Sequence, residues 1–138
     1  MFDECLYFNT TCLARQLERE WTVAFKPFDL TPPQAFMLRL ILDHPGLLPH
    51  QIADDLAISR PTATRLLDGL ESKQLVERRA AQEDGRELQI FPTPKGKARK
   101  LALEAASRAT ARRVRRMVGG EFIDETVEHL RATRDALQ

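Results

Sequence analysis

The sequence predicts a mainly α-helical chain that carries one small β-hairpin. Over most of its length, apolar residues recur every three or four residues, which is the spacing of an amphipathic helix. A threonine followed by proline marks two of the helix starts. Only between residues 75 and 91 does this period give way to two short strand-like runs around an Asp-Gly pair. The 138 residues fit one compact domain, or one domain with a helical appendage.

The composition is that of an ordinary globular protein, with 43% apolar and 30% charged residues, so disordered and disulfide-scaffold classes are excluded. The longest apolar runs are too short to cross a bilayer, and no basic segment followed by an apolar one opens the chain. We therefore expect no membrane partner and a cytoplasmic location. The two cysteines, Cys5 and Cys12, are expected to be thiols in that reducing compartment.

A first helix is expected from about Asp3 to Phe25. Pro27 ends it, because the residue before a proline is biased out of the helical conformation. The apolar stripe of this helix is wide for a terminal helix, so we expect it to contact more than one neighbour. Its members recur every four residues: Leu13, Leu17, Trp21 and Phe25.

Three further helices are expected before the hairpin. The run Thr31-Pro32-Pro33-Gln34 has the pattern of a capping box and opens the second helix, which Pro45-Gly46 stops. A short third helix is expected over residues 49–56. Ser59 is a good N-cap for a fourth helix that ends near Lys73. The expected inward faces are Phe36, Met37, Leu40 and Ile41, then Ile52, Ala53 and Leu56, then Ala63, Leu66, Leu67 and Leu70.

The next segment is predicted to be a hairpin with strands over residues 75–79 and 87–91. After it, Thr93-Pro94 opens a helix that is expected to run unbroken to about Val118. Gly119-Gly120 ends that helix, and a last helix with few apolar positions follows.

Positive charge is concentrated in one segment of a chain whose net charge is only +1. From Lys95 to Arg116 there are nine basic residues and one acid, Glu104. Such a segment is compatible with binding a polyanion, although a solvated helix face is the commoner explanation. For the cluster from Arg112 to Arg116 we favour solvation or pairing between subunits.

The order of a short helix, a tight turn, a second helix and a hairpin is that of a winged helix-turn-helix. The helix after Ser59 is expected to enter the major groove of DNA with its first residues facing base edges. Arginine at the hairpin tip is expected to reach the adjacent minor groove. The candidate DNA-binding residues are Ser59, Arg60, Pro61, Thr62, Thr64 and Arg65 on the helix and Arg86 in the wing, whose tip is Asp84, Gly85 and Arg86. The alternatives are a solvated face and, for Arg65, pairing with Asp68 or Glu71.

In these segments the chain resembles the MarR (multiple antibiotic resistance regulator) family. The matching positions are Leu30–Gln34, Gln51–Leu56, Thr64–Glu71, Leu75–Arg78, Asp84, Arg86, Thr93 and Gly96. Three positions depart from the family pattern: Gly85 where many members carry a second wing arginine, Gln74 in place of glycine, and Pro92 in place of an apolar residue.

The resemblance implies a homodimer in which each subunit offers one winged helix to half of a palindromic operator. Residues 1–30 and 97–138 are then the N- and C-terminal dimerisation helices, and residues 31–96 the winged helix-turn-helix DNA-binding region. The implied function is a transcriptional regulator, as a repressor relieved by a small-molecule inducer or by cysteine oxidation. The alternative is a winged-helix protein-interaction module without specific DNA binding.

Some members of the family sense oxidants through a cysteine early in the first helix, which makes Cys5 the candidate sensor. A cysteine that only fills space is the commoner case. Cys5 and Cys12 are seven residues apart, about 10.5 Å along a helix, and cannot bridge within one intact helix. We find no glycine-rich phosphate loop, no metal-ligand spacing and no nucleophile with a nearby base, so no enzyme, cofactor or metal is expected.

Overall fold

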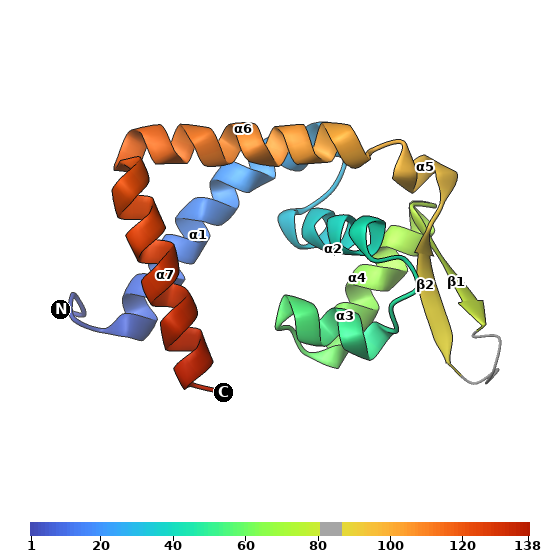
Figure 1. The fold of residues 1–138 in the computed structure, drawn as a ribbon, viewed down its shortest axis with the longest axis horizontal. Coiled ribbons are helices and arrows are strands. Elements are labelled where there is room, and N and C mark those ends of the chain that lie inside the picture. The colour runs from blue at the N-terminus through green and yellow to red at the C-terminus, as the bar shows by residue number, and fades with distance from the viewer. Residues whose placement is uncertain (81–86) are drawn as a thin grey trace.

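The computed structural model describes residues 1–80 and 87–138, and it confirms the predicted fold class. Helices α1 to α4 precede an antiparallel hairpin, and α5 to α7 follow it (Figure 1). The elements are α1 (Leu6–Phe25), the 3-10 helix η1 (Lys26–Phe28), α2 (Pro32–Asp43), α3 (Pro49–Leu56), α4 (Arg60–Ser72), β1 (Val76–Ala80), β2 (Leu88–Pro92), α5 (Pro94–Lys97), α6 (Lys100–Val118) and α7 (Gly120–Ala136).

Among the described residues, one apolar core lies where α2, α3, α4 and the hairpin meet the end of α1 and the start of α6. Burial of each large side chain in it contributes roughly 1.5–3 kcal/mol. Its largest fully buried members are Phe25, Met37, Leu38, Ile41, Ile52, Leu67, Leu70, Leu75, Ile90 and Leu103. Away from this core, α6 runs on beside α1, and α7 turns back so that it lines a groove together with the start of α1 (Figure 1). No helix in the described ranges is both long enough and apolar enough to span a membrane.

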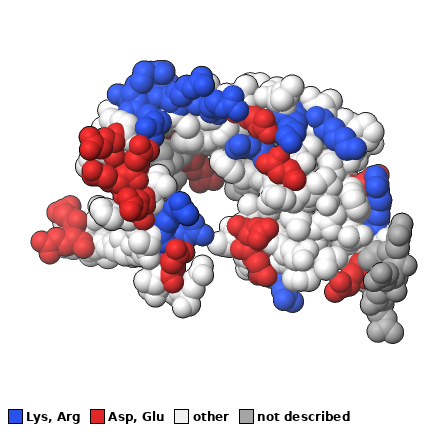
Figure 2. All heavy atoms as spheres, viewed as in Figure 1, with Lys and Arg blue, Asp and Glu red and all other residues white. Residues whose placement is uncertain are grey.

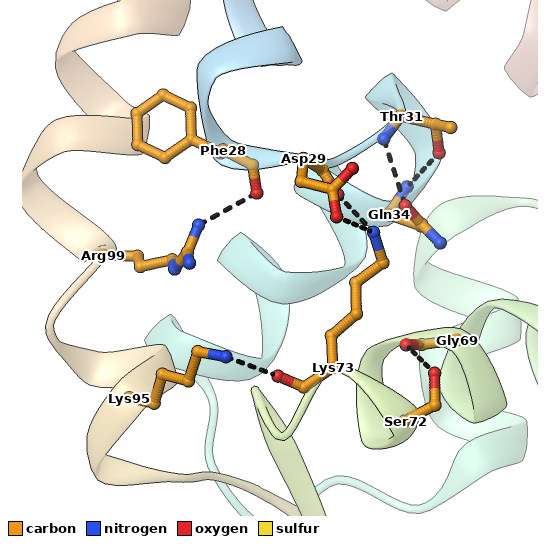
Figure 3. A network of polar contacts seen from close by, with 9 residues as sticks. All are labelled: Phe28, Asp29, Thr31, Gln34, Gly69, Ser72, Lys73, Lys95 and Arg99. Atoms are coloured by element: carbon orange, nitrogen blue, oxygen red, sulfur yellow. Dashed lines mark hydrogen bonds and ion pairs between the residues drawn. The ribbon is translucent and has the colours of Figure 1, made fainter.

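The start of α2 has the capping box that the sequence predicts. The backbone N–H of Gln34 donates to the hydroxyl of Thr31 at 3.4 Å, and the Gln34 side chain accepts from the backbone N–H of Thr31 at 3.1 Å (Figure 3). Lys73, at the end of α4, reaches back to the carboxylate of Asp29 at 3.1 Å. Arg99 donates to the carbonyl of Phe28 at 2.9 Å, so the end of α4 and the residue before α6 are both tied to the segment before α2.

Two expectations about the helices are wrong. Helix α1 begins at Leu6 rather than near Asp3, because Asn9 donates to the carbonyls of Asp3 and Cys5 and holds the first residues in a turn. The helix after the hairpin is broken between α5 and α6. Thr93 anchors α5 against the end of α4 by donating to the Gln74 carbonyl at 2.6 Å, whereas α6 follows α1 in a different direction.

Smaller differences concern register and the face of α2. Both strands lie one residue later than expected, with Arg78 opposite Ile90 in the antiparallel ladder. Phe36, expected to point inward, is exposed, and Ala35, Leu38 and Leu42 fill the core beside Met37 and Ile41. The ring of Phe36 instead meets Phe25 edge-on at 6.0 Å between centroids. The expected inward stripe of α1 is also only partly covered, since Phe25 is its one buried member.

Candidate nucleic-acid interface

Helices α3 and α4 are joined by a tight turn of three residues. Ala57 adopts the left-handed conformation, with φ 55°, and its backbone N–H closes the last turn of α3. The N–H of Ile58 donates to the Ala53 carbonyl at 3.0 Å, and Ile58 packs against the core. This turn is the joint of a helix-turn-helix and sets the direction in which α4 begins.

Ser59 is the N-cap of α4, as predicted. Its hydroxyl accepts from the backbone N–H of Thr62 at 3.3 Å and donates to the Thr62 hydroxyl at 2.9 Å. The capped start of a 13-residue helix therefore faces the surface, where unpaired N–H groups and the helix dipole favour a phosphate.

The predicted DNA-binding residues of α4 lie on its outer face. Arg60, Pro61, Thr64 and Arg65 are exposed and Thr62 is half-buried, while Ala63, Leu67 and Leu70 face the core. The Arg65 guanidinium donates to the Thr62 hydroxyl at 3.4 Å, and the Thr64 hydroxyl to the Arg60 carbonyl at 3.0 Å. The helix thus exposes two guanidinium groups about one and a half turns apart.

Arg78 of β1 forms ion pairs with Asp68 and Glu71, the two acids that were candidate partners of Arg65. Its guanidinium lies 2.6 Å from the Asp68 carboxylate and 3.3 Å from that of Glu71. Arg65 therefore has no acidic partner within residues 1–80 and 87–138. Sequence reasoning did not assign this role to Arg78. A signal for it existed, because alternation along β1 places Arg78 on the same side of the strand as the buried Val76.

The ion pairs of Arg78 join the hairpin to α4. Arg79, on the other side of β1, pairs with Glu77 and lies over the Phe91 ring at 4.4 Å. Between α3, α4 and the strands is a hollow of about 380 Å³, lined among others by His50, Arg60, Thr64 and Arg78. Glu87 also lines the hollow and Arg78 is already held by Asp68 and Glu71, which leaves Arg60 as the lining guanidinium that suits an anionic backbone.

The wing positions Asp84, Gly85 and Arg86 lie outside the described residues, and their contribution stays a prediction. The departures from the family pattern at the edges of the hairpin are accommodated. Gln74 adopts a left-handed conformation, with φ 60°, in which glycine is usual. Pro92 is buried at the end of β2, opposite Val76.

The two cysteines lie apart from this surface, on α1. Cys5 is exposed and occupies the N-cap position of the helix, and Cys12 is half-buried in it. Both are free thiols. Within the part of the chain that the structure describes, no cluster of histidine, cysteine or carboxylate side chains is suited to a metal ion.

The sequence of this chain is similar to those of known regulators. The MarR family model matches residues 28–87. The HTH-type transcriptional regulator MgrA of Staphylococcus aureus is 30% identical over 105 residues, which are 75% of this chain and 71% of that protein. The chain belongs to the MarR family of transcriptional regulators. A Bacillus subtilis (strain 168) relative, "Uncharacterized HTH-type transcriptional regulator YybA", is 31% identical over 85 residues, 62% of this chain; those residues span 57% of the relative's length.

Solved structures of MarR-type regulators share the fold. The transcriptional regulator SlyA superposes with a TM-score of 0.85 at 21% identity, over 96% of this chain and 94% of that one. The Staphylococcus aureus MepR–DNA complex gives 0.85 at 22% identity, over 95% and 96%. The repressor CouR bound to a 23-mer DNA duplex gives 0.84 at 26% identity, over 96% and 94%. The MarR fold therefore extends over nearly the whole chain, including α1, α6 and α7.

Proposed function

We propose that this MarR-family protein binds DNA sequence-specifically as a homodimer and represses transcription from a palindromic operator. The observation that carries the proposal is the charge arrangement on α4. Arg60 and Arg65 are exposed on its outer face, while the nearby acids Asp68 and Glu71 are held by Arg78. Two proteins of this fold, MepR and CouR, have been solved with DNA, which supports the same use here.

In this proposal α4 is the recognition helix and lies in the major groove. Arg60 and Arg65 fork to base edges or phosphates, and Ser59 with the start of α4 receives a phosphate. Arg78 does not contact DNA itself. It positions the hairpin against α4, so that Arg86 enters the adjacent minor groove where the potential is most negative.

The homodimer follows from apolar surface outside the core. Between the start of α1 and the end of α7 lies a groove of about 630 Å³, lined among others by Leu6, Tyr7, Leu130 and Leu137. Exposed apolar surface of this kind marks an interaction site. We assign residues 1–30 and 97–138 to dimerisation and residues 31–96 to DNA binding. The two recognition helices then lie about one DNA turn, roughly 34–36 Å, apart.

A winged-helix module that binds only proteins is the second candidate. Such a module needs exposed apolar residues on the outward face of its recognition helix. The outward face of α4 instead carries Arg60, Thr64 and Arg65, and this composition favours DNA.

The decisive experiment selects bound duplexes from a random pool and then measures the affinity of variants by fluorescence anisotropy. Arg65→Ala is expected to lower specific binding by about 1–3 kcal/mol, and the affinity of the wild type is expected to fall steeply with salt. Lys26→Ala, which removes an exposed charge from η1, is the control and should bind as the wild type. Equal discrimination between selected and random duplexes by Arg65→Ala would remove Arg65 from the base-reading residues.

Relief of repression has two candidate places. An apolar hollow of about 430 Å³ lies between α1 and the start of α2, lined among others by Leu17, Trp21 and Phe36, and suits an apolar inducer. Cys5, exposed at the helix N-cap, suits oxidation.

Operator binding is measured before and after mild peroxide for the wild type, Cys5→Ser and Cys12→Ser. If peroxide abolishes binding by the wild type and Cys12→Ser but not by Cys5→Ser, Cys5 is the sensor. If peroxide abolishes binding by none of the three, the inducer is a small ligand.

A further inference from the structure

The outer face of α6 carries a stripe of arginines that the proposed function does not use. Arg108, Arg112 and Arg116 are exposed and follow one another by four residues, about 6 Å each along the helix axis. Figure 2 shows the basic side chains gathered along the end of α6 that leads into α7. Like charges four residues apart destabilise a helix, so this stripe has a cost that an anionic partner offsets.

The other arginines of this segment are already paired. Arg113 is held by Glu20 of α1, and Arg115 by Asp124 of α7 at 2.6 Å. In the same described residues, 1–80 and 87–138, the three arginines of the stripe make no ion pair. We refer to Arg108, Arg112 and Arg116 as the arginine stripe.

Helix α7 carries an acidic stripe of matching length. Glu121, Glu125 and Glu128 are exposed, and they recur after four and three residues, spanning about 10.5 Å against about 12 Å for the arginine stripe. These three carboxylates form no ion pair with any other residue that the structure describes. We refer to these residues as the glutamate stripe.

The two stripes do not meet within one chain. Gly119, with φ 109°, turns the chain sharply between the two helices, and α7 leaves α6 at a steep angle (Figure 1). Across this corner the Arg115–Asp124 pair is the ionic contact that the described side chains make. Met117 on α6 and Phe122 on α7, on either side of this corner, are also exposed.

We propose that the arginine stripe of α6 binds the glutamate stripe of α7 from a second copy of the chain. This proposal rests on the proposed homodimer and names the contact that specifies it. In a two-fold dimer the contact occurs twice, because each copy offers both stripes. A nucleic acid duplex is the other polyanion that fits the arginines. The second copy fits better because it neutralises both stripes, whereas a duplex leaves the glutamates unpaired.

A charge swap tests the pairing. One triple variant carries Arg108→Glu, Arg112→Glu and Arg116→Glu; the other carries Glu121→Arg, Glu125→Arg and Glu128→Arg. Each variant alone places like charges against each other in both contacts, and its self-association is expected to weaken about tenfold or more. A mixture of the two restores opposite charges in both contacts, so a heterodimer of wild-type strength is expected. Sedimentation velocity with one labelled variant measures this, and circular dichroism checks folding.

The results distinguish a failure of the proposed homodimer from a failure of the pairing between the two stripes. A monomeric wild type defeats the homodimer, and the pairing with it. A dimeric wild type whose reversed variants still self-associate equally well, or do not associate when mixed, overturns the pairing alone. If the arginine variant stays dimeric and loses salt-dependent affinity for random duplex, the stripe is a DNA surface and the pairing is also overturned. Should a triple variant unfold, Arg112→Glu and Glu125→Arg are compared in the same way. The control for net charge carries Arg60→Glu, Arg65→Glu and Lys95→Glu, which are exposed, lie outside the dimerisation segments and change the charge as much as the arginine variant; it should remain dimeric.

Discussion

Two regions of this molecule differ in how they bury their apolar side chains. Residues 25–103, the winged region, contain every buried apolar side chain among the described residues. Residues 1–24 and 104–138, the helical arms, contain none of them, and there Tyr7 is 77% and Leu137 81% exposed. The winged region is therefore a unit that one chain completes, whereas the arms lack a core of their own.

The difference teaches where stability and assembly reside in one chain. In the winged region three helices, a hairpin and parts of two more helices enclose the same core. In the arms, α7 has no buried residue and contacts mainly α6. An amphipathic helix gains most of its stability by packing its apolar face. We therefore expect substitutions in the winged region to change the free energy of unfolding of one chain. The stability of the arms is expected to depend instead on the association of two chains.

The largest effect is expected from two leucines of the winged region, one buried and one exposed. Leu38→Ala removes a fully buried side chain of α2 and is expected to lower the free energy of unfolding by about 2–5 kcal/mol. Leu101→Ala removes a side chain that is 80% exposed and is expected to change it by less than about 0.5 kcal/mol. Urea denaturation at one protein concentration measures both. Equal losses of unfolding free energy in the two variants would show that the exposed Leu101 contributes as much to stability as the buried Leu38.

Two glycines of the winged region give the next largest contrast. A methyl group on Gly96 would lie 2.2 Å from the Leu75 carbonyl oxygen, so Gly96→Ala forces α5 away from the hairpin. We expect a loss of about 1–3 kcal/mol. A methyl group on Gly69 meets only the end of the flexible Gln34 side chain, at 2.9 Å, and alanine favours the helix. Gly69→Ala is therefore expected to be neutral or stabilising, and thermal denaturation that ranks the two the other way contradicts this account of α5.

The arms are tested by protein concentration. If they complete a core between two chains, a tenfold increase in concentration raises the free energy of unfolding by about 1.4 kcal/mol through mass action. Leu130→Arg places a charge in the groove between α1 and α7 and is expected to abolish this dependence. Calorimetric melting temperatures over a hundredfold concentration range measure it. A wild type that melts at the same temperature throughout would mean that the arms are stable alone.

The smallest effect concerns an ion pair inside the winged region that ties the end of α2 to the start of α6. Lys100, at the start of α6, lies 2.9 Å from Asp43 at the end of α2, and its hydrogen bond holds the pKa of that carboxyl below the ordinary value of 3.8. Because the pKa is lower in the folded state, the contribution is complete above pH 3.8 and is lost as the pH falls below it.

Asp43→Asn is therefore expected to cost less than about 1 kcal/mol at pH 7, since the pair is largely exposed, and to cost nothing in acid below the folded pKa. Asp135→Asn, at an exposed carboxylate with no ion pair in the described ranges, is the control. Unfolding free energies from pH 7 down to pH 3 make the comparison. A difference between Asp43→Asn and wild type that persists unchanged in acid would rule out the ion pair as its cause.

The sequence predicted those parts of the fold and of the candidate site that depend on neighbours in the chain. The caps Thr31 and Ser59 act within three residues, so their patterns predicted the starts of α2 and α4. The outward position of Arg60 and Arg65 followed from the helical period. The break after α5 was missed because the hydrogen bond that anchors α5, from Thr93 to the Gln74 carbonyl, joins residues nineteen positions apart.

By itself, then, the sequence determined the order of helices and hairpin, the capped start of the recognition helix and the face that carries its arginines. Tertiary structure alone decided that Phe36 turns outward and that α5 and α6 are separate. It also decided that Arg78 takes the acids next to Arg65. The physical reason is that hydrogen bonds at helix ends and amphipathic spacing are local, whereas the direction of a helix and the partner of a charge depend on surfaces that meet only when the chain has folded.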